Sequence, residues 1–308
     1  MYGKFYQTTP LLMHKSGFVN IIGQPNVGKS TLTNALLGQK MSIITSKPQT
    51  TRHRILGIYN DDDYQIIFSD SPGLIEDPSY SMHKSMNKFA YSSFDDADIL
   101  MFVVDLFEDY EGDEKVLQLL KKTKSPKFLI INKIDLDKNE KLENIRKKWS
   151  SMLSFDQVFE ISALENQGLD TLLDAIKENL NEGPAYYPKD QMSDRNVRFF
   201  VTELVRECIL QSYKQEVPYS CEVIIDNYKD SEKNGKPFAH IYATIFVSRK
   251  TQKGILIGKG GEKIKQLGID SRKKIEEFVD HPVFLQLNVK VREGWRESEK
   301  QLKYFGYN

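Results

Sequence analysis

Cysteine is scarce in this chain of 308 residues, which contains only Cys208 and Cys221. Both lie in apolar surroundings without the spacing of a metal site, so we expect buried thiols that stay reduced, as in a cytosolic protein. Long apolar runs are missing too. A run such as residues 99–104 has the length of one strand, and no run approaches the length of a membrane-spanning helix.

The chain also lacks net charge, because 43 basic residues balance 43 acidic ones. Residues 185–308 hold 22 Lys and Arg against 17 Asp and Glu, whereas residues 1–184 hold 21 against 26. We therefore expect a polyanionic partner to bind the second part. The first dozen residues have neither the basic start nor the long apolar centre of a signal peptide, and we interpret residues 1–16 as an N-terminal extension.

What the chain does contain is an octapeptide at residues 23–30, Gly-Gln-Pro-Asn-Val-Gly-Lys-Ser, that fits the phosphate-binding P-loop. A strand predicted at residues 18–22 precedes it and a helix predicted at residues 31–38 follows it, as the motif requires. Glycines let backbone N–H groups point at phosphate oxygens, and the helix N-terminus adds the positive end of its dipole. The predicted phosphate-binding residues are Gly23, Asn26, Val27, Gly28, Lys29, Ser30 and Thr31.

A second motif, Asn132-Lys133-Ile134-Asp135, follows the apolar run at residues 128–131. The Asp135 carboxylate can accept two hydrogen bonds from the ring N–H and the exocyclic amino group of guanine, whereas adenine offers no such pair of donors. The Lys133 stem would lie over the base, and the Asn132 amide would tie this loop to the P-loop. In this position, about a hundred residues after a P-loop, the motif indicates GTP.

Two polar segments between these motifs have the positions of nucleotide-dependent switches. We predict switch I at Gln49, Thr50, Thr51, Arg52 and His53. We predict switch II, at the end of a strand, at Asp70, Ser71, Pro72, Gly73 and Leu74. Mg²⁺ would be held by Ser30, by Thr51 while the γ-phosphate is present, and by Asp70 through water. The Gly73 N–H would contact the γ-phosphate.

The last nucleotide element is a short segment after the strand predicted at residues 158–161. It consists of Ser162, Ala163 and Leu164, where a backbone N–H would bind the guanine carbonyl. Each of these segments is weak evidence alone. The five motifs in this order predict a GTP-binding domain.

The catalytic side lacks a residue that many small GTPases have. Position 74 is leucine instead of the glutamine that orients the attacking water, so we expect hydrolysis to be slow or to depend on another group, an ion or a partner. Asn26 indicates one route, because in a subset of GTPases an asparagine here helps to hold a K⁺ ion. The alternative is that Asn26 only satisfies backbone groups of the loop, and the sequence does not decide between the two.

The order of apolar and amphipathic segments divides the chain into domains. Strands alternate with helices from residue 18 to residue 180, which predicts an α/β fold with a doubly wound, mostly parallel sheet. The periodicity stops at residues 181–188, where we expect a linker. The predicted division is an extension at 1–16, a GTPase domain at 17–182, a linker at 183–192 and a second domain at 193–308.

The second domain contains a Gly-x-x-Gly loop at residues 258–261, in a segment, residues 249–274, with nine basic and two acidic residues. The elements predicted around the loop are a helix at 193–212, strands at 220–226 and 239–248, two helices, and a strand at 283–292. This α+β order is typical of a type II KH domain, which binds single-stranded RNA. The predicted RNA-binding residues are Lys253, Gly258, Lys259, Gly260, Gly261 and Lys263.

A P-loop GTPase followed by a KH domain resembles the Era GTPases of bacteria and organelles, here over residues 17–296. The resemblance rests on residues 23–30, 49–53, 70–73, 132–135, 162–163 and 258–261, in that order. It implies assembly of the small ribosomal subunit and binding of the 3′ end of its ribosomal RNA in the GTP state. It also implies loose association with the inner membrane surface, for which the sequence offers no helix or lipidation site. The lack of a transit peptide favours a bacterial member, and one departure is Ser71, where threonine is commoner.

Two hypotheses of different classes follow. In the first, the chain is a cytoplasmic, monomeric switch whose partners are GTP or GDP, Mg²⁺, single-stranded ribosomal RNA and the small ribosomal subunit. In the second, the C-terminal domain docks a protein or the membrane surface, and the chain is a signalling GTPase. Salt-sensitive binding of a short RNA by residues 193–308 alone would support the first.

Overall fold

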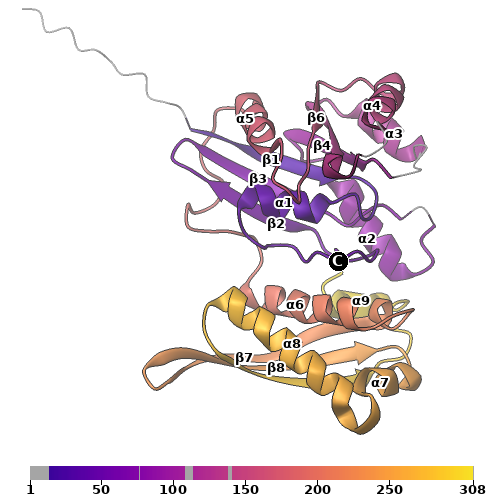
Figure 1. The fold of residues 1–308 in the computed structure, drawn as a ribbon, viewed down its shortest axis with the longest axis vertical. Coiled ribbons are helices and arrows are strands. Elements are labelled where there is room, and N and C mark those ends of the chain that lie inside the picture. Colours follow the sequence, from indigo (N-terminus) through magenta and orange to yellow (C-terminus); the bar gives the residue numbers. More distant parts are fainter. Residues whose placement is uncertain (1–13, 76, 108–113, 138–140, 308) are drawn as a thin grey trace, which may run out of the picture.

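The computed structural model describes residues 14–75, 77–107, 114–137 and 141–307. The predicted N-terminal extension lies almost wholly outside these residues. Within them the chain builds two layered units, which lie one above the other in Figure 1. Among the described residues, no helix has the length and apolar character needed to cross a membrane.

Six strands form the sheet of the first unit, in the order β2-β3-β1-β4-β5-β6. They are β1 (Lys15–Ile22), β2 (Ile55–Asn60), β3 (Tyr64–Asp70), β4 (Ile99–Asp105), β5 (Lys127–Asn132) and β6 (Gln157–Glu160). All neighbours are parallel except β2, which runs antiparallel to β3. Every residue of β4 is buried, as expected of a central parallel strand covered on both faces. This is the predicted doubly wound, mostly parallel sheet.

Helices cover both faces of this sheet. They are α1 (Lys29–Leu37), α2 (Ser81–Ser92), α3 (Glu114–Lys122), α4 (Lys141–Met152) and α5 (Leu169–Asn179), with a 3₁₀ turn, η1, at Ile134–Leu136. Leu36 of α1 and Leu172 of α5 pack in the core on one face. Ala90 of α2, Leu120 of α3 and Trp149 of α4 pack in the core on the other. Because the neighbouring strands other than β2 are parallel, their carboxyl ends lie at one edge of the sheet, and the loops that follow them can form a site there.

The segment between α5 and the second unit lies along the β2–β3 side of the sheet. The backbone N–H groups of Tyr186 and Tyr187 donate to Gln65 Oε1 at 2.6 and 2.9 Å. Further on, the Ser193 hydroxyl donates to the Leu56 carbonyl at 2.6 Å. These bonds hold the segment against the GTPase sheet along much of its length.

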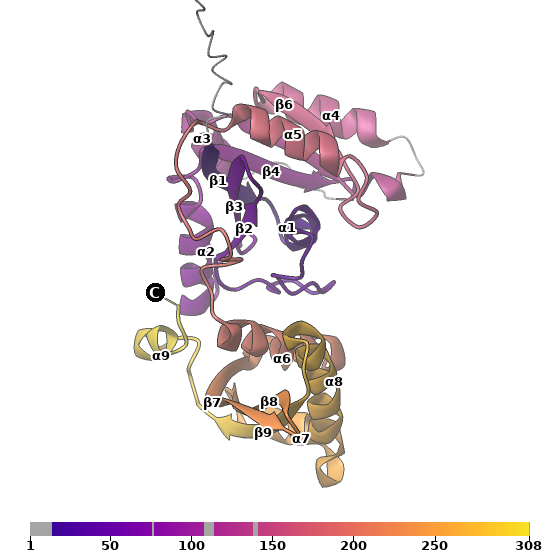
Figure 2. The same ribbon diagram turned by 90° about the vertical axis from the view of Figure 1, so that its left-hand side faces the viewer.

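The second unit is a three-stranded sheet with helices on one face and a short C-terminal helix that packs beside the other (Figure 2). Its elements are α6 (Val197–Ser212), η2 (Pro218–Ser220), β7 (Cys221–Lys233), β8 (Lys236–Val247), α7 (Lys250–Ile257), η3 (Lys259–Gly261), α8 (Glu262–Val279), β9 (Val283–Val291) and α9 (Glu299–Tyr304). The sheet order is β7-β8-β9, with β8 antiparallel to β7 and parallel to β9. Its core includes Cys208 and Cys221, which are buried and form no disulfide.

Two features of this unit differ from the sequence-based expectation. Strand β7 runs seven residues beyond the predicted 220–226, and β8 begins three residues before the predicted 239–248; the two meet at Asn234 and Gly235, whose φ angles are 55° and 72°. The prediction stopped early because the residues after Ile225 are largely charged and polar, although Asn-Gly is a favoured hairpin turn. Helix α9 was also missed, because its single buried residue, Leu302, gives no periodic pattern.

Candidate functional site

The P-loop connects β1 to α1 and is shaped by its glycines. Gly23 and Gly28 have φ angles of 149° and 98°, which side-chain-bearing residues rarely adopt. A Cβ atom on Gly23 would lie 2.2 Å from the Val103 carbonyl oxygen, and one on Gly28 would lie 2.3 Å from Asn132 Nδ2. Both positions therefore require glycine for space as well as for conformation.

Lys29 begins α1 and is almost fully buried, with 7% of its surface exposed. Its Nζ donates to the carbonyl oxygens of Gly23 and Gln24 at 2.9 and 2.7 Å. The ammonium group is thus held inside the curve of the loop, where the phosphates of a nucleotide would lie. Thr31, the third helical residue, also lines the pocket.

The three residues predicted to hold Mg²⁺ lie together. The Ser30 hydroxyl donates to Asp70 Oδ2 at 2.7 Å, and the hydroxyl oxygens of Ser30 and Thr51 are 2.9 Å apart. Asp70 is fully buried, and its Oδ1 has no hydrogen-bond partner among the described residues. Burial raises the pKa of Asp70, while the Ser30 hydrogen bond and the Lys29 charge oppose that rise.

Asn132 organises the loops that were predicted to bind guanine. Its Nδ2 donates to the Val27 carbonyl at 2.9 Å, which ties β5 to the P-loop, and its Oδ1 accepts the Ala163 N–H at 3.0 Å. The Ala163 N–H, one of the predicted donors to the guanine carbonyl, is therefore occupied by Asn132. Asp135 and Leu164 line the pocket and are exposed.

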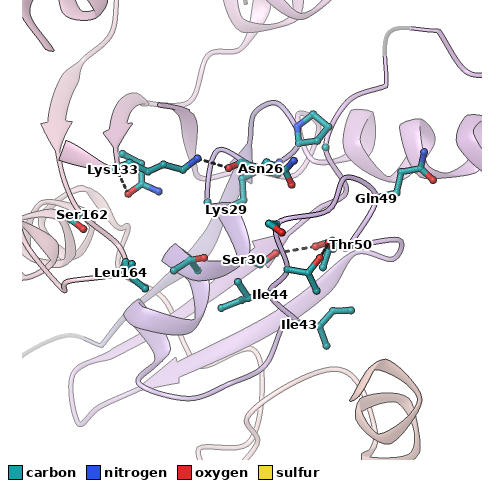
Figure 3. Close-up of a pocket in the computed structure, with 18 of the residues that line it drawn as sticks. Asn26, Lys29, Ser30, Ile43, Ile44, Gln49, Thr50, Lys133, Ser162 and Leu164 are labelled. Carbon is teal, nitrogen blue, oxygen red and sulfur yellow. Dashed lines mark hydrogen bonds between the residues drawn. The ribbon is translucent and has the colours of Figure 1, made fainter. Parts of the chain in front are cut away.

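Lys133 has a left-handed backbone conformation, with φ of 66°, and its Nζ donates to the Asn26 carbonyl at 2.8 Å (Figure 3). The same ammonium group forms an ion pair with Asp105, a partner that the sequence did not predict. Asp105 Oδ1 also accepts the Phe107 N–H at 2.9 Å, so this carboxylate shapes the turn after β4 as well. The Asn26 side chain is exposed and lines the pocket.

These segments enclose a pocket of about 530 Å³. The predicted residues that line it are Asn26, Gly28, Lys29, Ser30, Thr31, Gln49, Thr50, Thr51, Gly73, Asn132, Lys133, Asp135, Ser162 and Leu164. The predicted residues that do not line it are Gly23, Val27, Arg52, His53, Asp70, Ser71, Pro72, Leu74 and Ala163. Ile43 and Ile44, which the sequence did not indicate, lie across the pocket from the Lys133 side in Figure 3.

The segment predicted as switch II is held by contacts with β1 and with the core of the first unit. The Ser71 hydroxyl donates to the Ile21 carbonyl at 3.0 Å, and Leu74 packs in the core beneath α2 and α3. A Cβ atom on Gly73 would lie 2.7 Å from the Pro25 nitrogen, so Gly73 approaches the P-loop closely. Leu74 thus points away from the pocket and offers nothing to an attacking water.

Two residues predicted in switch I face the second unit instead of the nucleotide. Arg52 is fully buried, and its guanidinium donates to the Cys221 carbonyl at 2.8 Å and to Glu222 Oε2 at 3.1 Å. His53 lies against the Tyr307 ring at 4.5 Å between ring centroids. Burial lowers the pKa of His53 to about 4, so the imidazole is neutral near pH 7.

Further contacts join predicted switch I and the segment just before it to α6 and the residue that follows it, and these were not predictable from the sequence. The Arg206 guanidinium donates to the Thr50 carbonyl, and its Nε donates to Glu203 Oε1 at 2.9 Å. The Lys47 ammonium donates to the carbonyl oxygens of Leu210 and Tyr213. Arg206 and Thr50 are 156 residues apart, and Lys47 is 163 and 166 residues from its two partners, so no local motif marks these contacts. Predicted switch I therefore lines the pocket on one side and contacts the second unit on the other.

The Gly-x-x-Gly loop lies between α7 and α8, far from the nucleotide pocket (Figure 1). Gly258, Gly260 and Gly261 have φ angles of 74°, 61° and 82°. Lys259 and Lys263 are exposed, and Lys253 is partly exposed. Three predicted lysines thus surround a loop that leads directly into the N-terminus of α8, whose dipole also favours phosphate.

The fold and these two sites define a P-loop GTPase joined to a KH domain. A family described as 50S ribosome-binding GTPase matches residues 18–133, and the KH domain family matches residues 216–296. The chain is 45% identical to GTPase Era of Lactobacillus helveticus over 294 residues, and 43% identical to GTPase Era of Syntrophus aciditrophicus over 298 residues. Each alignment covers 96% of both chains. The chain belongs to the Era family of GTPases.

Two solved Era structures have the same overall fold. One is Era in complex with MgGDPNP and nucleotides 1506–1542 of 16S ribosomal RNA, at 37% identity and a TM-score of 0.87, covering 96% of this chain and 99% of that one. The other is a variant of Aquifex aeolicus Era bound to GDP and AlF4⁻, at 35% identity and a TM-score of 0.86, covering 95% and 99%. The predicted fold class and the predicted family are thus confirmed.

Proposed function

We propose that this GTPase binds single-stranded ribosomal RNA through its KH domain under the control of bound GTP, and that it acts in assembly of the small ribosomal subunit. The related Era structure with MgGDPNP and a 16S ribosomal RNA segment supports this proposal. The Gly-x-x-Gly loop with Lys253, Lys259 and Lys263 supplies the RNA contacts, since glycines let a nucleic-acid backbone approach and lysines neutralise phosphates.

The observation that carries the proposal is the position of switch I between the two sites. Thr51 lies beside Ser30 at the nucleotide, 2.9 Å between hydroxyl oxygens, while the next residue, Arg52, donates to the Cys221 carbonyl of the KH domain. A movement of Thr51 on loss of the γ-phosphate would therefore pull on a buried guanidinium in the interface. We infer that this connection transmits the state of the nucleotide to the RNA-binding domain.

We assign the remaining nucleotide contacts as the sequence suggested. Lys29 and the P-loop N–H groups bind the phosphates, Asp135 reads the guanine edge, and the Gly73 N–H meets the γ-phosphate. We also propose that hydrolysis by the isolated chain is slow, because Leu74 is packed in the core and cannot orient water. Asn26 lies at the pocket, where a K⁺ ion held by its side chain would assist the reaction.

The residues around Asp70 fit Mg²⁺. Two hydroxyl oxygens and one buried carboxylate lie together, the unpartnered Asp70 Oδ1 is an acceptor that lacks a donor, and Mg²⁺ prefers oxygen ligands. When bound, Mg²⁺ neutralises the charge that develops on the phosphate oxygens. Ser30 and Thr51 would ligate it directly, and Asp70 would hold it through water.

The division of the chain and its surroundings are part of the same proposal. We propose a GTPase domain at residues 17–182, a linker at 183–192 and an RNA-binding domain at 193–308, although β1 begins at Lys15 and α6 at Val197. We propose a monomer located in the cytoplasm, with at most peripheral contact with the inner membrane surface.

The test is RNA affinity as a function of salt, measured for the full chain with a labelled single-stranded RNA and GTP analogue. Changing Lys259→Asp and Gly260→Asp together places two negative charges against the RNA phosphates. We expect loss of RNA binding by at least about a hundredfold and a salt slope shallower by roughly one unit. GTP affinity should be unchanged, since the P-loop lies in the other domain. If the RNA affinity equals that of the unmodified chain, the alternative is favoured, namely a signalling GTPase whose C-terminal domain docks a protein or the membrane surface.

A further inference from the structure

The KH sheet has a second face that the helices do not cover. Helices α6, α7 and α8 pack on one side, against Ile241 and Ile245 of β8 and Leu285 of β9 (Figure 2). Residues paired across neighbouring strands share a face, so the opposite side can be identified from the register. Phe238, His240 and Tyr242 of β8 lie on that opposite side, because they alternate with the buried Ala239, Ile241 and Ala243.

Aromatic rings gather on this open face. His240 pairs with Phe284 of β9, with ring centroids 5.8 Å apart, and the Tyr242 ring lies 5.9 Å from the same Phe284 ring. The Phe238 ring lies 5.1 Å from His240. Phe284 is 43% exposed, which is unusual for a phenylalanine in a sheet. The four rings form a continuous platform, which we call the aromatic platform.

Lysines border the aromatic platform on the same face. Lys229 pairs with His240, and Lys233 pairs with Lys236, which alternates with Pro237 and so shares the face of Phe238. The Lys233 ammonium lies 5.4 Å from the Phe238 ring centroid. All three lysines are exposed. They give the platform a cationic border along the β7–β8 hairpin.

The acidic residues of the same hairpin lie on the other face. Asp230 pairs with Ala239 and Glu232 with Pro237, so both point to the helix side of β7, where Asp230 lines a groove together with residues of α6 and α8. Asp226 is the acidic residue next to the platform, and its Oδ2 accepts the Thr244 hydroxyl at 2.6 Å. Along this part of β7, Lys229 and Lys233 therefore lie on the open face, and Asp230 and Glu232 lie on the face covered by helices.

One end of the open face is already covered within the chain. Phe246 packs against Phe305 at 5.4 Å, and the Arg292 guanidinium lies 4.8 Å from the Phe246 ring. This cover, from the segment around α9, lies toward the other end of the strands from the aromatic platform, because Phe246 pairs with Lys290 whereas His240 pairs with Phe284, six residues away along each strand. Strand β9 is an edge strand of the sheet, and α8, which follows the Gly-x-x-Gly loop, lies on its other side, where a Cβ atom added to Gly268 would lie 4.0 Å from Leu287 Cδ1.

We propose that the aromatic platform and its three lysines form a second RNA-binding surface. Bases of the single strand would stack there after the strand has left the Gly-x-x-Gly loop, followed α8 over its length of roughly 27 Å and passed the β9 edge. Bases of any identity stack on aromatic side chains, and lysines at the border neutralise the backbone. A single-stranded polyanion fits this combination of charge and rings better than a protein partner does. This inference rests on the proposed RNA-binding function.

The experiment compares two labelled single-stranded RNAs, one of about 5 nucleotides, enough for the Gly-x-x-Gly clamp, and one of about 20 nucleotides. Both are titrated into the full chain with GTP analogue. Changing Tyr242→Ala and Phe284→Ala together should weaken binding of the long RNA about tenfold or more and leave the short RNA within about twofold. A thermal melt tests whether the variant is folded, which we expect because Phe284 is a surface residue.

A charge-reversal pair sharpens the result. The double variant Lys229→Glu, Lys233→Glu should weaken binding of the long RNA and reduce the slope of its affinity against salt concentration by roughly one unit. The matched control is Lys121→Glu with Lys122→Glu on α3, exposed residues with the same change of net charge, which should leave RNA affinity unchanged. Equal effects from both pairs would reduce the surface to a general charge effect and overturn the proposal.

The variant with Lys259→Asp and Gly260→Asp separates this proposal from the proposed function. If it loses RNA while the platform variants bind both RNAs as the unmodified chain does, the RNA-binding function stands and the second surface is wrong. If no variant affects RNA, both are wrong. If platform variants bind RNA normally but lose a self-association detected by sedimentation, the face contacts protein, and the RNA proposal is overturned.

Discussion

The chain has two glycine loops placed to meet phosphate, and their surroundings are opposite. Gly28 in the P-loop and Gly260 in the KH loop have positive φ angles of 98° and 61°. At Gly28 a Cβ atom would lie 2.3 Å from Asn132 Nδ2, whereas at Gly260 it would meet nothing within 4 Å. Gly28 is therefore required for space and conformation, and Gly260 for conformation alone. At Gly258 of the KH loop an added Cβ atom would lie 2.7 Å from Lys263 Cγ, which belongs to an exposed side chain and not to a neighbouring loop.

The lysines of the two loops differ in the same way. Lys29 is 7% exposed and is held by two carbonyl oxygens, while Lys259 is exposed at the tip of its loop. A preorganised pocket suits a compact ligand that binds in one pose, and an open loop suits a chain that passes over it and is bound chiefly through charge. We infer from this difference that nucleotide binding depends on the geometry of the pocket, and RNA binding on the sum of many contacts.

Replacing each lysine by alanine gives the largest contrast. Lys29→Ala should reduce GTP affinity by about a thousandfold, since no other side chain in the loop can neutralise the β- and γ-phosphates. Lys259→Ala should reduce RNA affinity by only about tenfold, because neighbouring lysines remain. Calorimetry with GTP and a fluorescence titration with RNA measure the two. Micromolar GTP binding by Lys29→Ala would remove this residue from its assigned role.

Base reading should also differ between the sites. Asp135→Asn should weaken GTP binding by on the order of a hundredfold and favour xanthine nucleotides, whose carbonyl accepts where the guanine amino group donates. Titration with GTP and XTP, and with RNA as the control, measures the change. If preference for GTP persists, Asp135 does not face the base.

The glycines test the comparison directly. Gly28→Ala should lower GTP affinity by about tenfold or more, because the added Cβ displaces Asn132 and with it the link from Asn132 Nδ2 to the Val27 carbonyl. Gly260→Ala should lower RNA affinity by less than about tenfold, since it costs only the left-handed conformation, about 1–2 kcal/mol. Similar losses in the two variants would show that the KH loop is as tightly enclosed as the P-loop.

The smallest expected effect concerns the monovalent ion. If Asn26 helps to hold K⁺, replacing K⁺ by Na⁺ should slow GTP hydrolysis several-fold from a basal rate on the order of 10⁻⁴–10⁻² s⁻¹. RNA affinity should respond to ionic strength and not to which of the two ions is present. Equal hydrolysis rates in the two salts would leave Asn26 as a residue of loop geometry only.

The local parts of this architecture could be predicted from the sequence. The P-loop, the Asn132–Asp135 segment and the Gly-x-x-Gly loop are short motifs whose chemistry depends on neighbouring residues, so their types and spacing carry the information. The alternation of apolar strands and amphipathic helices likewise gave the parallel sheet, because continuous burial requires continuous apolar runs. The hairpin of β7 and β8 had only its Asn234-Gly235 turn as a signal.

The connection between the domains could not be predicted, because it joins distant residues of ordinary type. Arg52 and His53 were predicted to belong to switch I, but nothing in their neighbourhood indicates Cys221, Glu222 or Tyr307 as partners. The Lys133–Asp105 ion pair was missed for the same reason. Such contacts depend on how the two domains pack, which a motif does not encode.

The central claim is that switch I links the nucleotide pocket to the KH domain, and it is tested most directly by measuring RNA affinity for one chain in two nucleotide states. The account predicts that a labelled single-stranded RNA binds roughly 5- to 150-fold more tightly with GDPNP than with GDP, and that the RNA raises the affinity for GDPNP relative to GDP by the same factor. Equal RNA affinity in the two states would contradict it, because the contacts of Thr51 and Arg52 would then not transmit the state of the nucleotide to the KH domain.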